Sequence, residues 1–495
     1  MTDHLTRRRL LGAAGATLAL PLARRAEASA PVAHQLVAGT RMLDVNGRAA
    51  RVYRLVNETG QPGLALNPGE RFNVTLHNTL AEQTIIHWHG QLPDWKQDGF
   101  PWPETPPLPA GASKTYDFAP IAGTFWMHSH QGMQEQGLMT APLIVRDNAT
   151  ATEDRQEVVL MLHDFSFRSP EDLLAGLSKP GAMGGMSAGA TGSMQMTAGQ
   201  MTAGQMKSGS MPTMPMNGMP SDDVDLNDID YDAFLANDRT LTDPEVVSVE
   251  KSGRLRLRVI NAASSSQFWL DLGALTGQVV AVDGHAVHPV SGARFPLAIA
   301  QRLDILVDLP TAGAFPVLAR LEGSDRQTGL VLATAGAAVK KQPDKAGAST
   351  SPLDLSLEQK LSAVTPLAAR KADISQTILL SGAMQPYAWS LDQAAWPNVP
   401  PLMLTAGQRV EIDLINASTM AHPMHLHGHA FQVVALGGKP VQGAVRDTVM
   451  VPPLGGSVRI AFDAVNPGRW AFHCHNLYHM MTGMMMEFRY QGIAV

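Results

Sequence analysis

One strand-like motif occurs three times in the chain, and this repetition limits the folds that the sequence can adopt. The copies span residues 69–78, 253–261 and 407–416, and each alternates apolar and polar residues before it ends on an asparagine. Such alternation is typical of a half-buried β-strand. Short alternating runs with frequent Gly and Pro continue through the chain, which favours β-sandwiches. The sequence therefore predicts an all-β protein of three sandwich domains.

The first and third copies differ from the middle copy in one chemical respect. Nine and eleven residues after the asparagine, they carry a His-x-His pair where the middle copy has two leucines. These positions are His87 and His89, Leu270 and Leu272, and His425 and His427. Ligands from two copies can complete one metal centre only if the two domains touch. The sequence therefore predicts a metal centre at the interface of the first and third domains, with the middle domain as a spacer.

The final stretch of the chain gathers the ligand types that copper prefers. A Cys thiolate, two imidazoles and a distant thioether form a trigonal electron-transfer copper site, and Cys474, His479 and Met484 supply three of those four ligands. Successive side chains of an extended segment point to opposite faces. His473 and His475 therefore face away from the copper of Cys474 and need another metal. This order gives electrons a short covalent path between two metal sites.

Histidines upstream can supply the missing ligands. Each His-x-His pair places both rings on one face of a strand, about 6.6 Å apart, which suits neighbouring metals. Ten of the seventeen histidines fall in four clusters. Ordinary core histidines are the alternative, but four clusters with the single cysteine in register favour metal binding. The clusters are His87 with His89, His128 with His130, His422 with His425 and His427, and His473 with His475 and His479.

These motifs resemble the four signatures of the multicopper oxidases in order and spacing, particularly those of bacterial copper-resistance and laccase-like members. The resemblance implies cupredoxin-like Greek-key domains and four copper ions. It also implies a role for every ligand position. A type 1 copper would take His422, Cys474, His479 and axial Met484, a type 2 copper His87 and His425, and a type 3 pair His89, His128, His130, His427, His473 and His475.

Two further residues stand at positions that have functions in the family. Asp98 resembles the carboxylate beside the copper cluster, which implies a role in relaying protons for O2 reduction; an ordinary turn aspartate before glycine is the alternative. Met420, two residues before His422, resembles a substrate-copper methionine. The acid that such relatives carry two residues earlier is Ser418 here, and Met480 stands where some relatives have another acid. The second proton donor is thus left unassigned.

The expected activity is that of an oxidase that takes electrons one at a time at type 1 copper. Cys474 would pass each electron to His473 and His475, and O2 would be reduced to two waters, so these residues and Asp98 are the catalytic candidates. Cu(I) is the expected substrate, which would make the protein a copper-detoxification enzyme. A laccase acting on small phenols or aromatic amines is the alternative. A non-catalytic copper-binding or envelope scaffold protein is the third hypothesis.

The N-terminal residues predict export of the folded protein. Three arginines at 7–9 precede an apolar run that ends at Leu22, and the small-residue site 26–28 follows. This pattern is typical of a cleaved twin-arginine signal over residues 1–28. The apolar run is too short to span a bilayer, although an uncleaved anchor is the alternative. We expect a monomer in the bacterial periplasm without stable membrane insertion, and the formal charge of −6 makes nucleic acid an unexpected partner.

The remaining segments set the expected domain boundaries. Domain 1 is expected over 31–148, a copper-free domain 2 over 155–336, a linker over 337–370 and domain 3 over 371–495. Residues 181–220 are rich in Met, Gly, Ser, Thr and Gln and lack core-forming periodicity, so they predict a disordered insertion in domain 2. Because thioethers select Cu(I), cuprous capture is the functional interpretation, and an inert loop is the alternative. The candidate ligands are Met211, Met214, Met216 and Met219.

Overall fold

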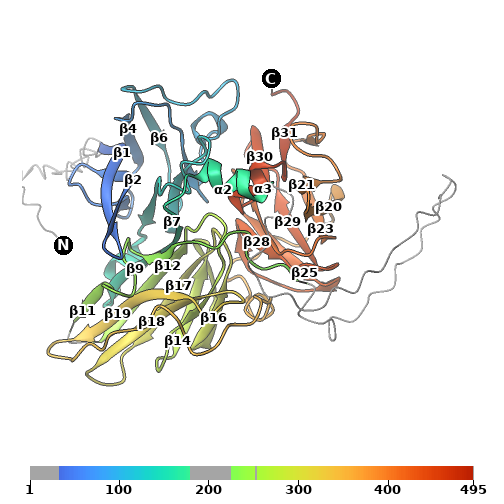
Figure 1. Ribbon diagram of the computed structural model, residues 1–495. Helices are drawn as coiled ribbons and strands as arrows, with labels where there is room; N and C mark the ends of the chain where they lie inside the picture. The colour runs from blue at the N-terminus through green and yellow to red at the C-terminus, as the bar shows by residue number, and fades with distance from the viewer. Residues whose placement is uncertain (1–32, 179–223, 251–252, 494–495) are drawn as a thin grey trace, which may run out of the picture.

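The computed structural model describes residues 33–178, 224–250 and 253–493. In this part of the chain the strands form six sheets, which pair into three sandwiches grouped around a common centre (Figure 1). The prediction of an all-β protein with three sandwiches is therefore confirmed. The signal segment 1–28 and the insertion 181–220 lie outside the described residues, and so do Met211, Met214, Met216 and Met219.

The first sandwich, blue to cyan in Figure 1, consists of two four-stranded sheets with the orders β2-β1-β4-β6 and β3-β8-β7-β5. A 3-10 turn at Trp95–Gln97 follows the strand Ile86–His89, which carries His87 and His89. The strands are β1 (His34–Val45), β2 (Arg48–Asn57), β3 (Leu64–Leu66), β4 (Phe72–Asn78), β5 (Ile86–His89), β6 (Ser113–Phe118), β7 (Gly123–Ser129) and β8 (Thr140–Val145).

The second sandwich, mainly green to yellow, pairs a six-stranded sheet of order β10-β9-β12-β17-β14-β15 with a five-stranded sheet of order β11-β19-β18-β13-β16. Its strands are β9 (Gln156–Phe165), β10 (Ala233–Ala236), β11 (Val246–Val249), β12 (Arg254–Asn261), β13 (Phe268–Asp271), β14 (Gly277–Val282), β15 (His285–Gly292), β16 (Arg294–Leu297), β17 (Arg302–Asp308), β18 (Ala314–Leu321) and β19 (Gln327–Thr334). Two short helices accompany them, α1 (Asn148–Thr152) and α2 (Pro170–Leu177).

The third sandwich, orange to red, pairs a sheet of order β21-β20-β23-β29-β25-β26, with β27 joined to β25, and a sheet of order β22-β31-β30-β24-β28. Helix α3 (Leu477–Met481) follows β30. The strands are β20 (Ile374–Met384), β21 (Tyr387–Leu391), β22 (Leu402–Leu404), β23 (Arg409–Asn416), β24 (His422–Leu426), β25 (Phe431–Leu436), β26 (Lys439–Pro440), β27 (Val445–Arg446), β28 (Thr448–Val451), β29 (Ser457–Asp463), β30 (Arg469–Cys474) and β31 (Met485–Tyr490).

The repeated motif forms the equivalent strand in each sandwich, namely β4, β12 and β23. Each of these strands pairs in parallel with the first long strand of its sandwich and antiparallel with a later one. The terminal asparagine anchors the loop that follows. In the third copy, Asn416 accepts a hydrogen bond from the backbone NH of Ser418 and donates to the carbonyls of Met420 and Val451. Asn78 and Asn261 make equivalent bonds, so the motif fixes how the chain enters the next strand.

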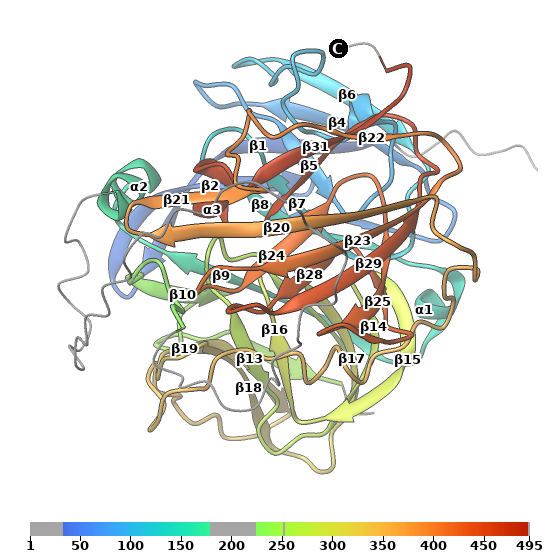
Figure 2. The ribbon, with the colours of Figure 1, turned by 90° about the vertical axis from the view of Figure 1, so that its right-hand side faces the viewer.

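The histidine-bearing strands of the first and third sandwiches have matching registers. His87 on β5 lies opposite His128 on β7, and His425 on β24 lies opposite His473 on β30. Figure 2 shows the molecule with the third sandwich, orange to red, toward the viewer. The ring centroids of His87 and His427 are 3.9 Å apart. The two sandwiches therefore meet at their histidine pairs, as the sequence predicts.

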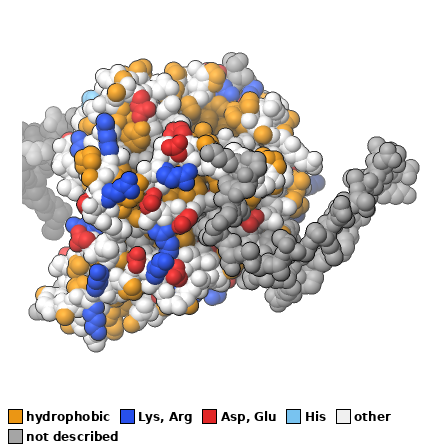
Figure 3. Space-filling view, viewed as in Figure 1, with side chains coloured by type: hydrophobic (Ala, Val, Ile, Leu, Met, Phe, Trp, Pro, Cys, Tyr) orange, Lys and Arg blue, Asp and Glu red, His pale blue; other side chains and the backbone are white. Residues whose placement is uncertain are grey.

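The surface carries both kinds of charge. On the face shown in Figure 3, basic and acidic side chains are interspersed among apolar and neutral ones. Charged side chains of the described residues also pair across strands, as Arg71 does with Asp117 and Arg459 with Asp413. Among the described residues, no helix has both the length and the apolar character needed to cross a membrane.

Candidate metal centres

Three side chains of the third sandwich converge on one point. Cys474 ends β30, His422 begins β24, and His479 lies in α3. Cys474 Sγ is 3.7 Å from His422 Nδ1 and 3.6 Å from His479 Nδ1, and the two Nδ1 atoms are 3.1 Å apart. Ligand atoms about 2.0–2.3 Å from a metal stand roughly 3–4 Å apart when the angles between them at the metal are about 100–120°. The three atoms therefore fit around one metal ion.

The short helix α3 returns the chain so that His479 lies beside Cys474. Asn476 caps this helix by accepting hydrogen bonds from the backbone NH groups of Tyr478 and His479. The turn after the helix then brings Met484 back to the same place. The NH of Met484 donates to the carbonyl of His479, and its own carbonyl accepts from the NH of Cys474, both at 3.0 Å. Met484 is completely buried, so all four residues of the expected type 1 site lie in one buried group.

A polar side chain lies beside the outer nitrogen of each histidine in this site. Ser418 Oγ is 2.7 Å from His422 Nε2, and Asp228 Oδ2 is 3.2 Å from His479 Nε2. Asp228 also accepts a hydrogen bond from Asn476. Both rings consequently turn Nδ1 toward the thiol. Asp228 precedes β10 of the second sandwich, and no sequence motif marked it; Ser418, noted above only as a departure from the family, holds a ring.

Burial makes this thiol a poor acid in the absence of a cation. Burial raises the pKa of the Cys474 thiol, and the nearby Asp228 raises it further. Burial also holds the pKa of His422 well below its usual value, so this imidazole stays neutral. Neutral imidazole and thiolate are the forms that bind metal, and a metal ion displaces the thiol proton. The chemistry of the group therefore fits a soft metal such as copper.

Eight more histidines form a second buried group between the first and third sandwiches. None of their side chains is more than 7% exposed. In seven of these rings, burial is the largest cause of a lowered pKa, so those imidazoles stay neutral at neutral pH. The members are His87, His89, His128, His130, His425, His427, His473 and His475.

The hydrogen bonds of this group leave bare ring nitrogens, meaning nitrogens that carry no hydrogen, facing one another. His427 Nδ1 donates to Asp98 Oδ2 at 2.8 Å, and His473 Nδ1 donates to the carbonyl of Cys474 at 2.9 Å. Both acceptors lack a proton to give, so neither Nε2 atom carries hydrogen in a neutral ring. Yet these Nε2 atoms are 3.0 Å apart. Two lone pairs at this distance repel each other unless a cation lies between them, which fits a metal ion.

A second pair of rings also turns nitrogens toward each other. His89 Nε2 donates to Asp447 Oδ1 at 3.0 Å, and His128 Nδ1 lies 2.7 Å from the carboxylate oxygen Oε2 of Glu135. The remaining atoms, His89 Nδ1 and His128 Nε2, are 3.4 Å apart. The ring of His475 has its centroid 5.0 Å from those of both histidines. These three rings therefore surround a second point that suits a metal.

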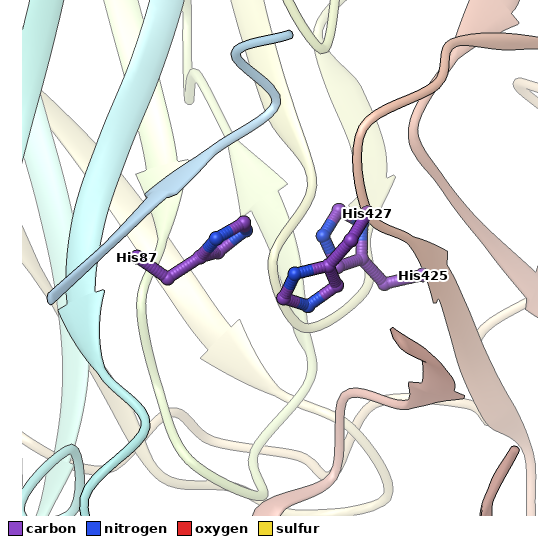
Figure 4. Close-up of side chains that lie close together, drawn as sticks. All are labelled: His87, His425 and His427. Atoms are coloured by element: carbon purple, nitrogen blue, oxygen red, sulfur yellow. The ribbon is translucent and has the colours of Figure 1, made fainter. Parts of the chain in front are cut away.

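Two further rings, His87 and His425, aim nitrogens without hydrogen from opposite sides of the interface, while His130 lies with His427 and His473. His87 Nδ1 donates to the carbonyl of Asp98 at 2.8 Å, and His425 Nδ1 donates to the carbonyl of Asp447 at 2.9 Å. Their Nε2 atoms are buried and have no hydrogen-bond partner. Figure 4 shows His87 reaching from the first sandwich toward His425 and His427 of the third. The eight rings thus form one centre shared by two sandwiches.

Asp98 lies at this centre, where its turn comes close to the first histidine strand. Its carboxylate Oδ2 bonds to His427, and its Oδ1, 3.4 Å from His87 Nδ1, is buried without a hydrogen-bond partner. The next residue, Gly99, has φ +86°, and a Cβ there would lie 1.9 Å from the carbonyl oxygen of Ile86. Only glycine allows this approach, so the Asp98–Gly99 turn is shaped to bring the carboxylate to the rings.

Glu135 is a carboxylate of this centre that sequence reasoning missed. It lies between β7 and β8, is 3% exposed, and holds His128 Nδ1. Burial raises the pKa of Glu135 well above its usual value, and Asp164 adds to the effect. Its place in Gln134-Glu135-Gln136, five residues after His130, has no repeat or spacing that identifies a metal partner.

Glu135→Ala is expected to lower the affinity of the cluster for copper by about tenfold or more, because His128 loses the acceptor that orients its ring. Glu135→Gln keeps an acceptor oxygen at this position and should lose much less. Copper content after dialysis against graded chelator concentrations measures both effects. Wild-type retention of copper by Glu135→Ala would contradict this role.

The fold and the two groups of candidate ligand atoms fit a copper protein in which one thiolate site lies next to one histidine cluster. Comparison with known families agrees. Multicopper oxidase models match residues 40–150, 189–343 and 371–492. The chain belongs to the multicopper oxidase family, and it is an oxidoreductase whose cofactor is copper.

Individual relatives span nearly the whole chain. The chain is 30% identical to multicopper oxidase MmcO of Mycobacterium tuberculosis, over 97% of this chain and 91% of the relative. It is 25% identical to copper resistance protein A of Escherichia coli, over 97% of both chains. The crystal structure of the laccase from Botrytis aclada superposes with a TM-score of 0.71 at 21% identity, covering 93% of this chain and 88% of that one. The cupredoxin-like fold of the three sandwiches is thus confirmed.

Proposed function

We propose that the protein couples the one-electron oxidation of Cu(I) to the four-electron reduction of O2 to water. One observation supports this above all. Cys474 belongs to the thiolate site, whereas His473 and His475, its neighbours in sequence, belong to the histidine cluster. An electron accepted beside Cys474 therefore has a covalent route to the cluster. Copper, when bound, supplies the one-electron redox chemistry that protein side chains lack.

The bare ligand atoms divide into four sets, which we assign to four copper ions. His422, Cys474, His479 and Met484 would hold type 1 copper, and the Nε2 atoms of His87 and His425 would hold type 2 copper. The type 3 pair would take His89, His128 and His475 at one position, and His130, His427 and His473 at the other.

Asp98 would move protons at the cluster. O2 reduction consumes protons, and a carboxylate next to the reacting site can deliver them. Asp98 Oδ1 is buried without a hydrogen-bond partner while Oδ2 is bonded to His427. One oxygen therefore orients a ligand, and the other is free to exchange a proton. The buried rings around it exclude bulk water from the cluster.

The surroundings of the thiolate site favour a metal ion as the substrate. His422 and His479 are both completely buried. The adjoining cavity has a volume of about 80 Å³ and is lined by Met420, Asp225, Glu322 and other residues. Sites for drug-sized organic ligands are typically about 300–1,000 Å³. The thioether of Met420 is a soft ligand of the kind that suits a cuprous ion, so Met420 is our candidate for substrate binding.

Laccase activity on phenols or aromatic amines is the second candidate, because the chain is also similar to laccases, including one from Botryotinia fuckeliana at 26% identity over 86% of this chain. A non-catalytic scaffold role has less support, since all twelve expected ligand positions are filled and their side chains are buried. We place the protein in the periplasm as a monomer exported by the twin-arginine route, which the sequence of residues 1–28 supports.

Met420→Leu is expected to raise KM for Cu(I) several-fold while kcat changes little, because it removes a soft ligand from substrate capture and preserves the volume of the side chain. Phenol oxidation by the same variant should stay near the wild-type rate. Met161→Leu, a buried thioether of β9 in the second sandwich, is the matched control. Oxygen uptake with chelator-buffered Cu(I) and with a phenol measures both activities. Phenol turnover without Cu(I) turnover in the wild type would favour the laccase alternative.

A further inference from the structure

Two aspartates accept hydrogen bonds from rings of the histidine cluster in the same pattern, one from the first sandwich and one from the third. The main-chain carbonyl of Asp98 accepts from His87 of its own sandwich, and its carboxylate accepts from His427 of the other. The carbonyl of Asp447 accepts from His425 of its own sandwich, and its carboxylate accepts from His89 of the other. Each aspartate therefore links two histidines across the interface.

The stacking of the histidine rings across the interface has the same paired pattern as these hydrogen bonds. His87 stacks on His427 with centroids 3.9 Å apart, and His89 stacks on His425 at 3.8 Å. Asp447 is thus the counterpart of Asp98, although the two lie in unrelated sequence contexts. One follows a 3-10 turn in the first sandwich, and the other lies between β27 and β28 in the third.

The two aspartates differ in their contacts with the second sandwich, which donates hydrogen bonds to Asp447. Arg302 of β17 donates from Nη1 to Asp447 Oδ1 at 2.7 Å and from Nη2 to Oδ2 at 2.5 Å. Arg302 is completely buried and also donates to the carbonyls of Thr124 and Ala300. A bidentate pair with Arg holds a carboxylate in one orientation. Both Asp447 oxygens are therefore committed, whereas Oδ1 of Asp98 has no hydrogen bond.

The approach of this pair to the cluster depends on a glycine. Gly90, which follows His89, has φ +84°. A Cβ at this position would lie 2.4 Å from Asp447 Oδ2 and 2.7 Å from Arg302 Nη2. Glycine at position 90 therefore leaves the space in which Asp447 of the third sandwich and Arg302 of the second approach His89.

We propose that Asp447 and Arg302 are a positioning pair for the copper cluster. Ionised Asp447 accepts only, so it keeps the proton of His89 on Nε2 and leaves Nδ1 bare toward His128. Arg302 compensates the buried charge and fixes the carboxylate from the second sandwich. The second sandwich, which supplies none of the proposed copper ligands, would in this way set the geometry of a copper site between the other two. The inference rests on the proposed copper assignments.

The test compares Asp447→Asn with Glu358→Gln. Glu358 belongs to the same buried ionic group, where it pairs with Arg446, and Arg446 pairs with Asp283 at 2.9 Å. Hydrogen bonds of Glu358 thus reach Arg446 but no ring of the cluster. Both variants lose one buried carboxylate charge, so their loss of thermal stability should be similar. Only Asp447→Asn removes the ionised acceptor that fixes His89.

Asp447→Asn is expected to lower the copper affinity of the cluster by about tenfold or more, to weaken the near-ultraviolet absorption of the coupled copper pair, and to leave the blue thiolate absorption unchanged. Glu358→Gln should keep wild-type copper content and both absorptions. In the copper-free proteins, nitrogen NMR of labelled histidine should show His89 protonated on Nε2 in the wild type and a mixture of tautomers in Asp447→Asn.

Wild-type spectra and copper content in Asp447→Asn, or equal losses in both variants, would overturn the proposal and leave an ordinary buried ion pair. A wild-type protein without coupled copper would instead refute the copper assignments themselves. If Asp447→Asn does not fold, Arg302→Lys replaces it, because Lys keeps the charge but cannot bind both oxygens in a fixed plane. Arg302→Lys should then show the loss of coupled-pair absorption with the blue absorption retained, and unchanged spectra would contradict the role.

Discussion

Cys474→Ser is expected to abolish the blue absorption and to lower oxidase activity by at least about a hundredfold, since even residues that only orient copper ligands contribute about 10–100-fold. The variant removes the single thiol of the chain, whose Sγ lies between His422 and His479. A serine hydroxyl is a harder and weaker ligand and cannot give the thiolate-to-copper transition. The histidine cluster has its own ligands and should keep its copper.

The control for this variant is given by the internal repeat. Ser129 occupies the place in the first sandwich that Cys474 has in the third, and its hydroxyl bonds to Gln134. Ser129→Ala should stay blue. Absorption spectra and copper analysis of both variants, with oxygen uptake, measure the effect. Retained blue colour in Cys474→Ser would contradict the assignment of the type 1 site.

The copper-free protein is expected to lose stability steeply as the pH falls below about 6.5. Burial lowers the pKa of eight candidate ligand histidines, to about 4 for His473 and well below the usual value for the other seven. In the unfolded chain the same rings bind protons near pH 6.5. Between these values the unfolded state binds more protons, so the free energy of unfolding falls as the pH falls.

The expected size of this effect is large. Each ring that stays neutral in the folded state but binds a proton in the unfolded state lowers the free energy of unfolding as the pH falls, and all eight contributions have the same sign. Copper holds the rings in their neutral form and should shift the loss to lower pH. Thermal melts of the copper-free and copper-loaded proteins over this range check it, and a flat profile for the copper-free protein would count against the buried neutral rings.

The parts of the site that the sequence could predict are those that recur. The repeated strand, its asparagine and the His-x-His pairs occur in matching positions of the first and third copies, so comparison within one chain locates His87, His89, His425 and His427. In the Cys474 motif, successive side chains of an extended segment point to opposite faces, which predicts that Cys474 and its two histidine neighbours bind different metals. Such local patterns predict both the β-sandwich fold and the meeting of the first and third sandwiches.

The residues that hold the ligands could not be predicted in the same way. Asp228, Asp447 and Glu135 are single carboxylates, and in a sequence each resembles an ordinary surface acid. They reach the rings only because three sandwiches pack together, over separations such as 358 residues between His89 and Asp447. A charged pair at the start of an apolar strand, Arg446-Asp447 before Thr448–Val451, is the one signal that could have drawn attention to Asp447.

The second sandwich has a larger role than that of a spacer. The sequence predicts it to separate two metal-bearing copies, because leucines replace its histidines. In the structure it also provides Asp228 beside His479 and Arg302 beside Asp447. The middle sandwich, which lacks the paired histidines, therefore still provides residues beside the candidate ligands of both neighbouring centres. These contacts form only where the three sandwiches pack against one another, so the sequence of a single repeat does not predict them.

Anomalous diffraction at the copper absorption edge from copper-loaded crystals would locate each copper ion. We expect four copper peaks. One should lie among Cys474, His422 and His479, one between His87 and His425, and one in each of the sets His89–His128–His475 and His130–His427–His473. Copper confined to the Cys474 site, or bound by histidines of only one sandwich, would contradict a cluster shared by the first and third sandwiches.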